Sequence, residues 1–142
     1  KAGATPHPQM FPEPRLAVGQ TLVRRRLARA AIDLSDGLST DLAHLCRESG
    51  VGAEIDASML PIHPLALRAE RGPDRALTFA LDGGEDYELL FSAAPETRMP
   101  RSIAGVRVTR IGRLVRGSAI LMVDTTGRKK ALKPGGWEHF AP

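Results

Sequence analysis

A short apolar run that passes through a polar turn into an amphipathic helix constrains this chain more than any other feature. The run is Ala30-Ala31-Ile32, which predicts a buried strand, and the turn is Asp33-Leu34-Ser35-Asp36-Gly37. The apolar residues that follow share one face of a predicted helix, which Ser49-Gly50 ends: Leu38, Leu42, Leu45 and Cys46. The sequence therefore predicts a strand that delivers a polar turn to the start of a helix.

Helical spacing also occurs on both sides of this unit. Upstream, Leu16, Val23, Leu27 and Ala30 predict one apolar stripe, with the arginines at 24–26 turned outward. Downstream, Leu60-Pro61 opens a helical region that breaks near Arg71-Gly72-Pro73, and Asp74 is predicted to cap a further helix that runs through Leu81.

Strand signals occupy the remaining segments. Residues 51–56 alternate weakly, and Tyr87, Leu89 and Phe91 alternate with Asp86, Glu88 and Leu90, which is typical of a strand. Residues 106–115 and 119–123 predict a hairpin around Arg116-Gly117-Ser118. Since helices and strands alternate irregularly, we expect an α+β fold in which a mixed β-sheet packs against helices.

Length and composition limit the number of domains, the cellular compartment and the kinds of ligand that we expect for this chain. The 142 residues suit one domain, which we assign to residues 15–142, after an extended, proline-rich arm or linker at 1–14. The sequence has neither a membrane-spanning run nor a signal pattern, and one cysteine excludes an internal disulfide, so we expect a cytoplasmic protein. The net charge of +4 favours anionic ligands, but aromatic residues make up only 4%, which weighs against nucleic acid.

The polar turn carries the first candidate chemistry. Alternate residues of an extended backbone share a face, so Asp33 and Ser35 should project together, with Asp36 beside them at the mouth of the helix. Two carboxylates and a hydroxyl form an oxygen-rich site suited to Mg²⁺, which could bridge the oxygens of a nucleotide triphosphate. The structural alternative is that Ser35 or Asp36 simply caps the helix.

A second acidic segment, Gly83-Gly84-Glu85-Asp86-Tyr87-Glu88, places three acids after two glycines. Such a loop could hold a cationic ligand group through its carboxylates. The alternative is a turn whose acids face water. No P-loop or Rossmann glycine motif occurs, the histidines lack metal-ligand spacing, and Cys46 is expected to be a small core residue.

Several segments in order resemble the thiamine-monophosphate kinase family. They are Pro12-Glu13-Pro14-Arg15-Leu16, the strand and turn at 32–38, Ser49-Gly50-Val51-Gly52-Ala53, the acidic segment at 83–89, and Gly136-Trp137-Glu138-His139-Phe140. This family belongs to the aminoimidazole ribonucleotide synthetase-like superfamily, whose members have two α/β domains with ATP between them. The resemblance implies that the chain is the C-terminal domain of such a protein.

The resemblance also implies roles for residues. Asp33 and Asp36 would bind Mg²⁺, and Ser35 would contact the ATP phosphates. The thiamine phosphate would be contacted by residues of the acidic segment and the tail: Glu85 or Asp86, and Phe140 or Trp137.

For the whole protein, the resemblance implies direct transfer of the γ-phosphoryl group from ATP without a covalent enzyme intermediate, and a homodimer. The N-terminal ATP-binding domain lies outside these residues, so we expect the isolated chain to have little or no kinase activity. The alternatives are another ATP-dependent enzyme of the superfamily, or a basic binding module without catalysis.

Overall fold

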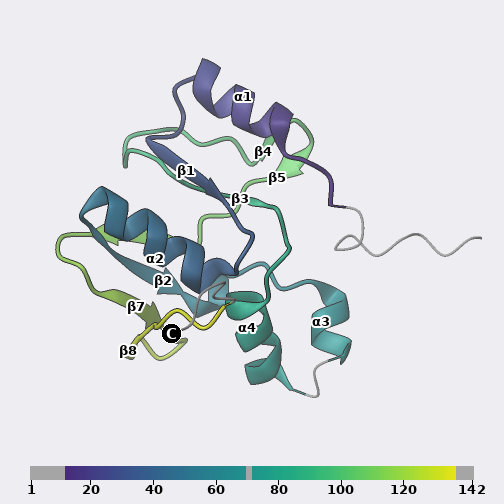
Figure 1. Cartoon of the computed structure of the whole chain (residues 1–142), viewed down its shortest axis with the longest axis vertical. Coiled ribbons are helices and arrows are strands. Elements are labelled where there is room, and N and C mark those ends of the chain that lie inside the picture. Colours follow the sequence, from purple (N-terminus) through teal and green to yellow (C-terminus); the bar gives the residue numbers. More distant parts are fainter. Residues whose placement is uncertain (1–11, 70–71, 137–142) are drawn as a thin grey trace, which may run out of the picture.

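A computed structural model describes residues 12–69 and 72–136 and confirms the α+β class. None of the helices in these ranges is long and apolar enough to span a membrane. Within the described residues, the helices, the strands and the 3₁₀ turn η2 follow one another (Figure 1) as α1 Leu16–Arg24, β1 Ala30–Asp33, α2 Leu38–Ser49, β2 Gly52–Asp56, η2 Ala57–Met59, α3 Pro64–Ala69, α4 Pro73–Asp82, β3 Leu89–Ser92, β4 Ser102–Ile103, β5 Val106–Arg107, β6 Gly112–Val115, β7 Ile120–Val123 and β8 Lys129–Ala131.

The largest sheet has the strand order β6-β2-β7-β8 and is mixed. β2 runs antiparallel to β6, with Ala53 opposite Leu114, and parallel to β7, with Ala53 opposite Ile120. The predicted hairpin between residues 106–115 and 119–123 is therefore wrong, because β2 lies between the two strands. With β2 between β6 and β7, the backbone N–H and C=O groups on both edges of β2 have partners. A direct hairpin between β6 and β7 would not provide these partners.

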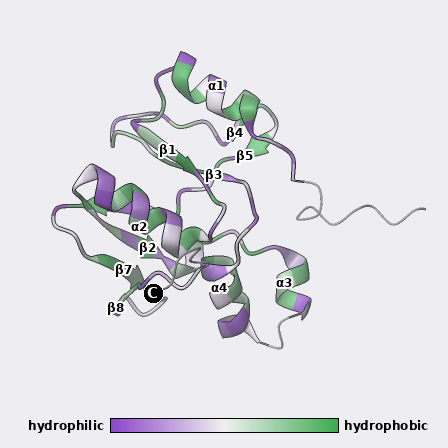
Figure 2. Cartoon of the chain, in the orientation of Figure 1, coloured by the Kyte–Doolittle hydropathy of each residue, from purple (hydrophilic) through white to green (hydrophobic). Residues whose placement is uncertain are grey.

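The first core lies between this sheet and the helices α2 and α4. Leu38, Leu42 and Cys46 of α2 are buried, as are Ala53 and Ile55 of β2. Figure 2 shows hydrophobic and hydrophilic residues alternating along α2, as expected for a helix with one face on a core. Cys46 is a free, buried cysteine, and burial raises the pKa of its thiol. The prediction of a small core residue is confirmed.

A second core joins α1 to the two-stranded sheets β1-β3 and β4-β5. Val18 and Leu22 are its buried helix residues, whereas Leu16 and Val23 are 71% and 78% exposed. The predicted stripe is therefore wrong, because α1 has only nine residues and ends at Arg24. Leu27 still reaches the core, but from the segment that follows the helix. The arginines at 24–26 are exposed, as expected.

Two predicted boundaries also differ from the structure. α4 has Gly72 at its N-cap, with Pro73 next and no side-chain cap, so Asp74 lies in the first turn and does not cap the helix. Proline at the first helical position needs no N–H partner and already has a helical φ. β3 begins at Leu89, because Tyr87 has a φ of 50°, which a strand does not allow.

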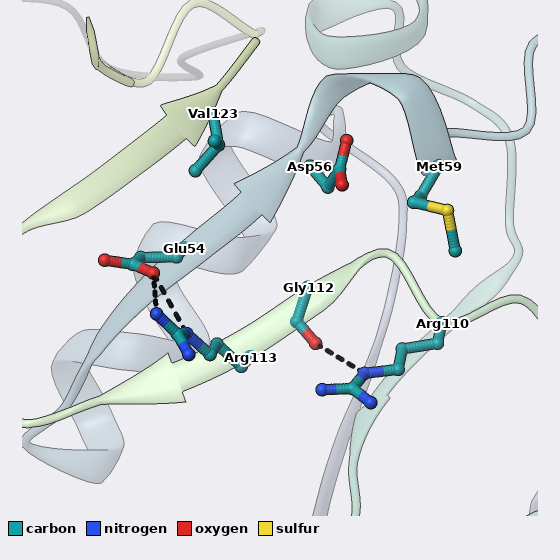
Figure 3. A pocket seen from close by; sticks show the side chains of 7 residues that line it. All are labelled: Glu54, Asp56, Met59, Arg110, Gly112, Arg113 and Val123. Carbon is teal, nitrogen blue, oxygen red and sulfur yellow. Dashed lines mark hydrogen bonds and ion pairs between the residues drawn. The ribbon is translucent and has the colours of Figure 1, made fainter. Parts of the chain in front are cut away.

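The face of the large sheet opposite α2 carries a shallow hollow of about 320 Å³ (Figure 3). Glu54 lies at its edge and accepts hydrogen bonds from Arg113 Nε at 2.9 Å and Nη2 at 2.6 Å, and another from Lys129. The bond from Lys129 and then those from Arg113 hold the pKa of Glu54 below its ordinary value of 4.5. Glu54 is therefore paired with cations of the chain itself, whereas Asp56, the other acid that lines the hollow, accepts hydrogen bonds from Ser58.

We expect Glu54→Gln to weaken the acid dependence of stability. A carboxyl whose pKa is lowered by folding stabilises the fold above its ordinary pKa, and this contribution is lost as the pH falls. The midpoint of urea unfolding should thus fall less steeply between about pH 5 and pH 3 in the variant than in wild type. Glu48→Gln is the control, since Glu48 forms an exposed pair with Arg47 at 3.4 Å. Equal slopes in Glu54→Gln and wild type would contradict the expectation.

Candidate functional site

The two acidic segments that the sequence presented separately lie side by side. β1 pairs with β3 so that Asp33 is opposite Leu89, and the ladder continues beyond the strands. Leu34 N donates to Glu88 O, Tyr87 N to Leu34 O, and Glu85 N to Ser35 O, each at 2.8 Å. The sequence did not predict this contact. It brings the polar turn and the acidic loop, hereafter residues 33–37 and 83–88, to one place (Figure 1).

Gly84 allows this close approach. A Cβ atom at this position would lie 2.6 Å from the Ser35 carbonyl oxygen, closer than carbon and oxygen can pack. The acidic loop also contains two non-glycine residues with positive φ, Glu85 at 65° and Tyr87 at 50°. Such conformations persist where surrounding contacts enforce them, here the hydrogen bonds to the polar turn.

The buried side chain of Asp41 holds the backbone of the polar turn in place. Its side chain is 3% exposed, and Oδ2 accepts hydrogen bonds from Ser35 N at 3.0 Å and Asp36 N at 3.1 Å. Burial raises the pKa of this carboxyl, with a further contribution from the charge of Asp36, although the two backbone N–H donors oppose the shift. The N-cap of α2 is Gly37, with no side-chain cap. The alternative in which Ser35 or Asp36 caps the helix is therefore wrong.

The predicted metal-binding carboxylates are accessible. Asp33 is exposed at the end of β1, and Asp36 is half-buried in the turn. Residues 33–41 and 82–88 contain seven carboxylates and no lysine or arginine, in a chain of net charge +4. In the described ranges no group of three His, Cys, Asp or Glu side chains has a metal-binding arrangement. A pair of carboxylates suits Mg²⁺, which proteins hold by one or two carboxylates together with phosphate oxygens and water.

The structure describes some of the other predicted site residues, and others lie outside the described ranges. Ser35 is half-buried, and its backbone is held on both sides, by Asp41 and by Glu85. Glu85 and Asp86 are exposed in the acidic loop. Trp137 and Phe140 lie outside the described residues, so their predicted role stays a prediction.

Ser39 and Thr40 were not predicted as site residues, yet they bind the segment before Trp137. Gly135 N donates to Ser39 Oγ at 3.0 Å, and Gly136 N donates to Thr40 Oγ1 at 3.2 Å. Ser39 Oγ in turn donates to Asp82 Oδ1 at 2.6 Å. No sequence signal identified them, because the burial that makes their hydroxyls require partners is seen only in the structure.

Arg15 was also missed as a contact to the site. Its Nε and Nη2 donate to the two carboxylate oxygens of Glu88 at 3.0 and 2.6 Å, and Nη1 donates to Glu13 at 3.1 Å. The hydrogen bonds that Arg15 donates to Glu88 are the main cause that raises the pKa of Arg15. This bidentate pair ties the segment before α1 to the end of the acidic loop. A separation of 73 positions hides it from local sequence patterns.

We expect Arg15→Lys to fail as a conservative change. Lysine keeps the charge but cannot match both carboxylate oxygens with a planar pair of donors. The free energy of unfolding, measured with urea, should fall by about 1 kcal/mol. Arg24→Lys is the matched control, because the Arg24 side chain is exposed and its Nη2 donates only weakly, to Thr21 Oγ1 at 3.4 Å. Equal stability of the two variants would contradict the importance of the bidentate geometry.

Comparison with known proteins relates this arrangement to a family. Residues 2–123 match the family described as "AIR synthase related protein, C-terminal domain". The chain is 42% identical over 134 residues to the thiamine-monophosphate kinase of Escherichia coli K12, covering 92% of this chain and 40% of that protein. The chain thus spans about two fifths of the length of this relative.

Solved structures agree with the match. The thiamine-monophosphate kinase of Stenotrophomonas maltophilia K279a is 38% identical, with a TM-score of 0.68 over 81% of this chain and 37% of that one. A structure described as "AaThiL complexed with AMPPCP and TMP" is 31% identical, with a TM-score of 0.76 over 99% of this chain and 44% of that one. The family match covers most of this chain, and the chain shares its fold with these solved structures. The chain therefore belongs to the AIR synthase related proteins and carries their C-terminal domain.

Proposed function

We propose that this chain is part of a thiamine-monophosphate kinase, which transfers the γ-phosphoryl group of ATP to thiamine phosphate and yields thiamine diphosphate. One observation carries the proposal: the polar turn and the acidic loop are hydrogen-bonded to each other. A nucleotide held at the turn and a cationic acceptor held at the loop would then be neighbours. The names of the relatives and the nucleotide analogue in one of the similar structures agree with this activity.

In this proposal Asp33 and Asp36 hold Mg²⁺, and Ser35 contacts the phosphates of ATP. When held by these carboxylates, the metal would supply positive charge that offsets the negative charge of the transferred phosphoryl group. Asp41 fixes the turn through the N–H groups of Ser35 and Asp36, so these residues need little reorganisation when the nucleotide binds.

The acidic loop supplies the acceptor side of the proposed site. Glu85, or Asp86 in its place, would pair with the positively charged thiazolium ring of thiamine, and Trp137 or Phe140 would lie against the rings. In direct transfer an oxygen of the acceptor phosphate attacks the γ-phosphorus in line, and the bond from the γ-phosphorus to the β,γ-bridging oxygen breaks to release ADP. The protein therefore contributes position and electrostatics and needs no nucleophile. We propose a cytoplasmic homodimer for the complete protein.

The test is an assay of the complete protein with ATP, Mg²⁺ and thiamine phosphate, in which the formation of thiamine diphosphate is measured directly. Turnover that stops when Mg²⁺ is chelated is the expected result, and the 142-residue chain alone should show little or none. No thiamine diphosphate from the complete protein would refute the proposal. Competition by formyl, selenide or carbamoyl substrates would favour another enzyme of the superfamily, and steeply salt-dependent binding to polyanions without turnover would favour a basic binding module.

A further inference from the structure

We propose that Ser39 and Thr40 are positioning residues, which hold Gly135 and Gly136 against the polar turn and thereby set the affinity for the acceptor. The inference rests on the proposed kinase function. It concerns residues in the first turn of α2 that have no role in the proposal so far.

Three consecutive buried side chains of this turn hold three different segments. Ser39, Thr40 and Asp41 are 1%, 5% and 3% exposed. Asp41 accepts from the polar turn, Ser39 binds both Gly135 and Asp82, and Thr40 accepts from Gly136. A buried hydroxyl without a partner is costly, so these bonds fix the segments relative to one another.

The fit of the tail segment at 135–136 is close. A Cβ atom on Gly136 would collide with the Asp36 carbonyl oxygen and lie 2.7 Å from Thr40 Oγ1. A Cβ atom on Gly135 would lie 2.8 Å from the Asp82 carboxylate. The tail therefore passes directly between the polar turn and Asp82, the residue that ends α4 and precedes the acidic loop.

The position of Asp82 points to the acceptor. Ser39 connects the tail to the acidic-loop side of the site, where carboxylates favour a cationic ligand over a triphosphate. If the tail loses these hydrogen bonds, it must become ordered when the acceptor binds. The entropy cost of this ordering weakens the binding of the acceptor in the ground state and in the transition state equally. Such a change raises KM for the acceptor and leaves kcat unchanged.

The experiment compares variants of the complete protein. Thr40→Val and Ser39→Ala remove the acceptor oxygen, whereas Thr40→Ser retains it. Thr78→Val is the matched control, because the Thr78 hydroxyl donates to Asp74 O on the exposed surface of α4. Thermal melting establishes that each variant is folded, and Thr40→Val, which preserves side-chain shape, decides the matter if Ser39→Ala does not fold.

Two readouts are required. Amide hydrogen exchange of peptides containing Gly135 and Gly136 should quicken in Thr40→Val and Ser39→Ala, and stay slow in Thr40→Ser and Thr78→Val. The KM for thiamine phosphate should rise roughly five- to tenfold in the first two variants, with kcat and the KM for ATP within about twofold of wild type.

Unchanged tail exchange, an unchanged acceptor KM, or an equal effect of Thr78→Val would overturn the inference. So would Thr40→Ser behaving like Thr40→Val. These results are distinct from failure of the proposed function, in which the wild-type protein itself makes no thiamine diphosphate and the acceptor assignment falls with it.

Discussion

Asparagine in place of Asp36 should reduce the Mg²⁺-dependent turnover of the complete protein by about 100-fold or more. The amide has nearly the shape of the carboxylate but lacks its charge, so the turn keeps its form while the proposed metal site loses a ligand. Asp33→Asn should act in the same way. The measurements are initial rates across a Mg²⁺ titration, in which both variants should need more Mg²⁺ for half-maximal activity.

The fold should tolerate these changes. The charge of Asp36 helps to raise the pKa of the buried Asp41 carboxyl, so neutralising Asp36 removes a repulsion and should leave the melting temperature at or slightly above that of wild type. Asp74→Asn removes an equal charge from the exposed surface of α4 and serves as the control. Full activity of Asp36→Asn at limiting Mg²⁺ would refute its role as a metal ligand.

Alanine in place of Gly84 should damage both stability and activity. Its Cβ atom would be forced against the Ser35 carbonyl oxygen and would push the acidic loop away from the polar turn. We expect a loss of about 1–3 kcal/mol in the free energy of unfolding, as for other overpacked sites. Displacement of groups that must be aligned for transfer should lower kcat/KM by about 100-fold.

Gly19→Ala is the matched control, and it should change the free energy of unfolding in the opposite direction. A Cβ atom on Gly19 would make only an ordinary contact, 3.8 Å from Leu89 Cδ1. Because Gly19 lies within α1, alanine should stabilise the protein by about 0.5–1 kcal/mol. Urea unfolding and the kinase assay measure both variants. Wild-type behaviour of Gly84→Ala would mean that the two loops need not touch.

The sequence predicted local structure better than long-range contacts. The strand at Ala30-Ala31-Ile32, the turn and the helix ending at Gly50 were all found, because each depends on neighbouring residues. The prediction that this strand is buried is wrong, since Ala31 is exposed and Ala30 and Ile32 are half-buried. Gly50 has a φ of 64°, the left-handed conformation that such a helix end requires. The hairpin failed because turn chemistry at Arg116-Gly117-Ser118 is compatible with strand pairing but cannot exclude a third strand between the two.

The candidate site was predictable only in parts. Clustered acids with no basic residue among them identified both loops, yet their contact depends on the pairing of β1 with β3 and on Gly84. Asp41 could have been suspected from a polar residue three positions after Leu38, on the apolar face of α2. Arg15 gave no such signal, because its partner is fixed only by the tertiary fold.

The strand order of the large sheet has a consequence for synthesis of the chain. β2 is its second strand from one edge, but both of its neighbours, β6 and β7, are translated long after it. Until Ile120 and Met122 leave the ribosome, Ala53 and Ile55 have no parallel partner, and the apolar side of α2 lacks a completed sheet to cover. Contacts so distant in sequence slow folding. A nascent chain ending before β7 should therefore bind chaperones and be cut readily by proteases within α2 and β2.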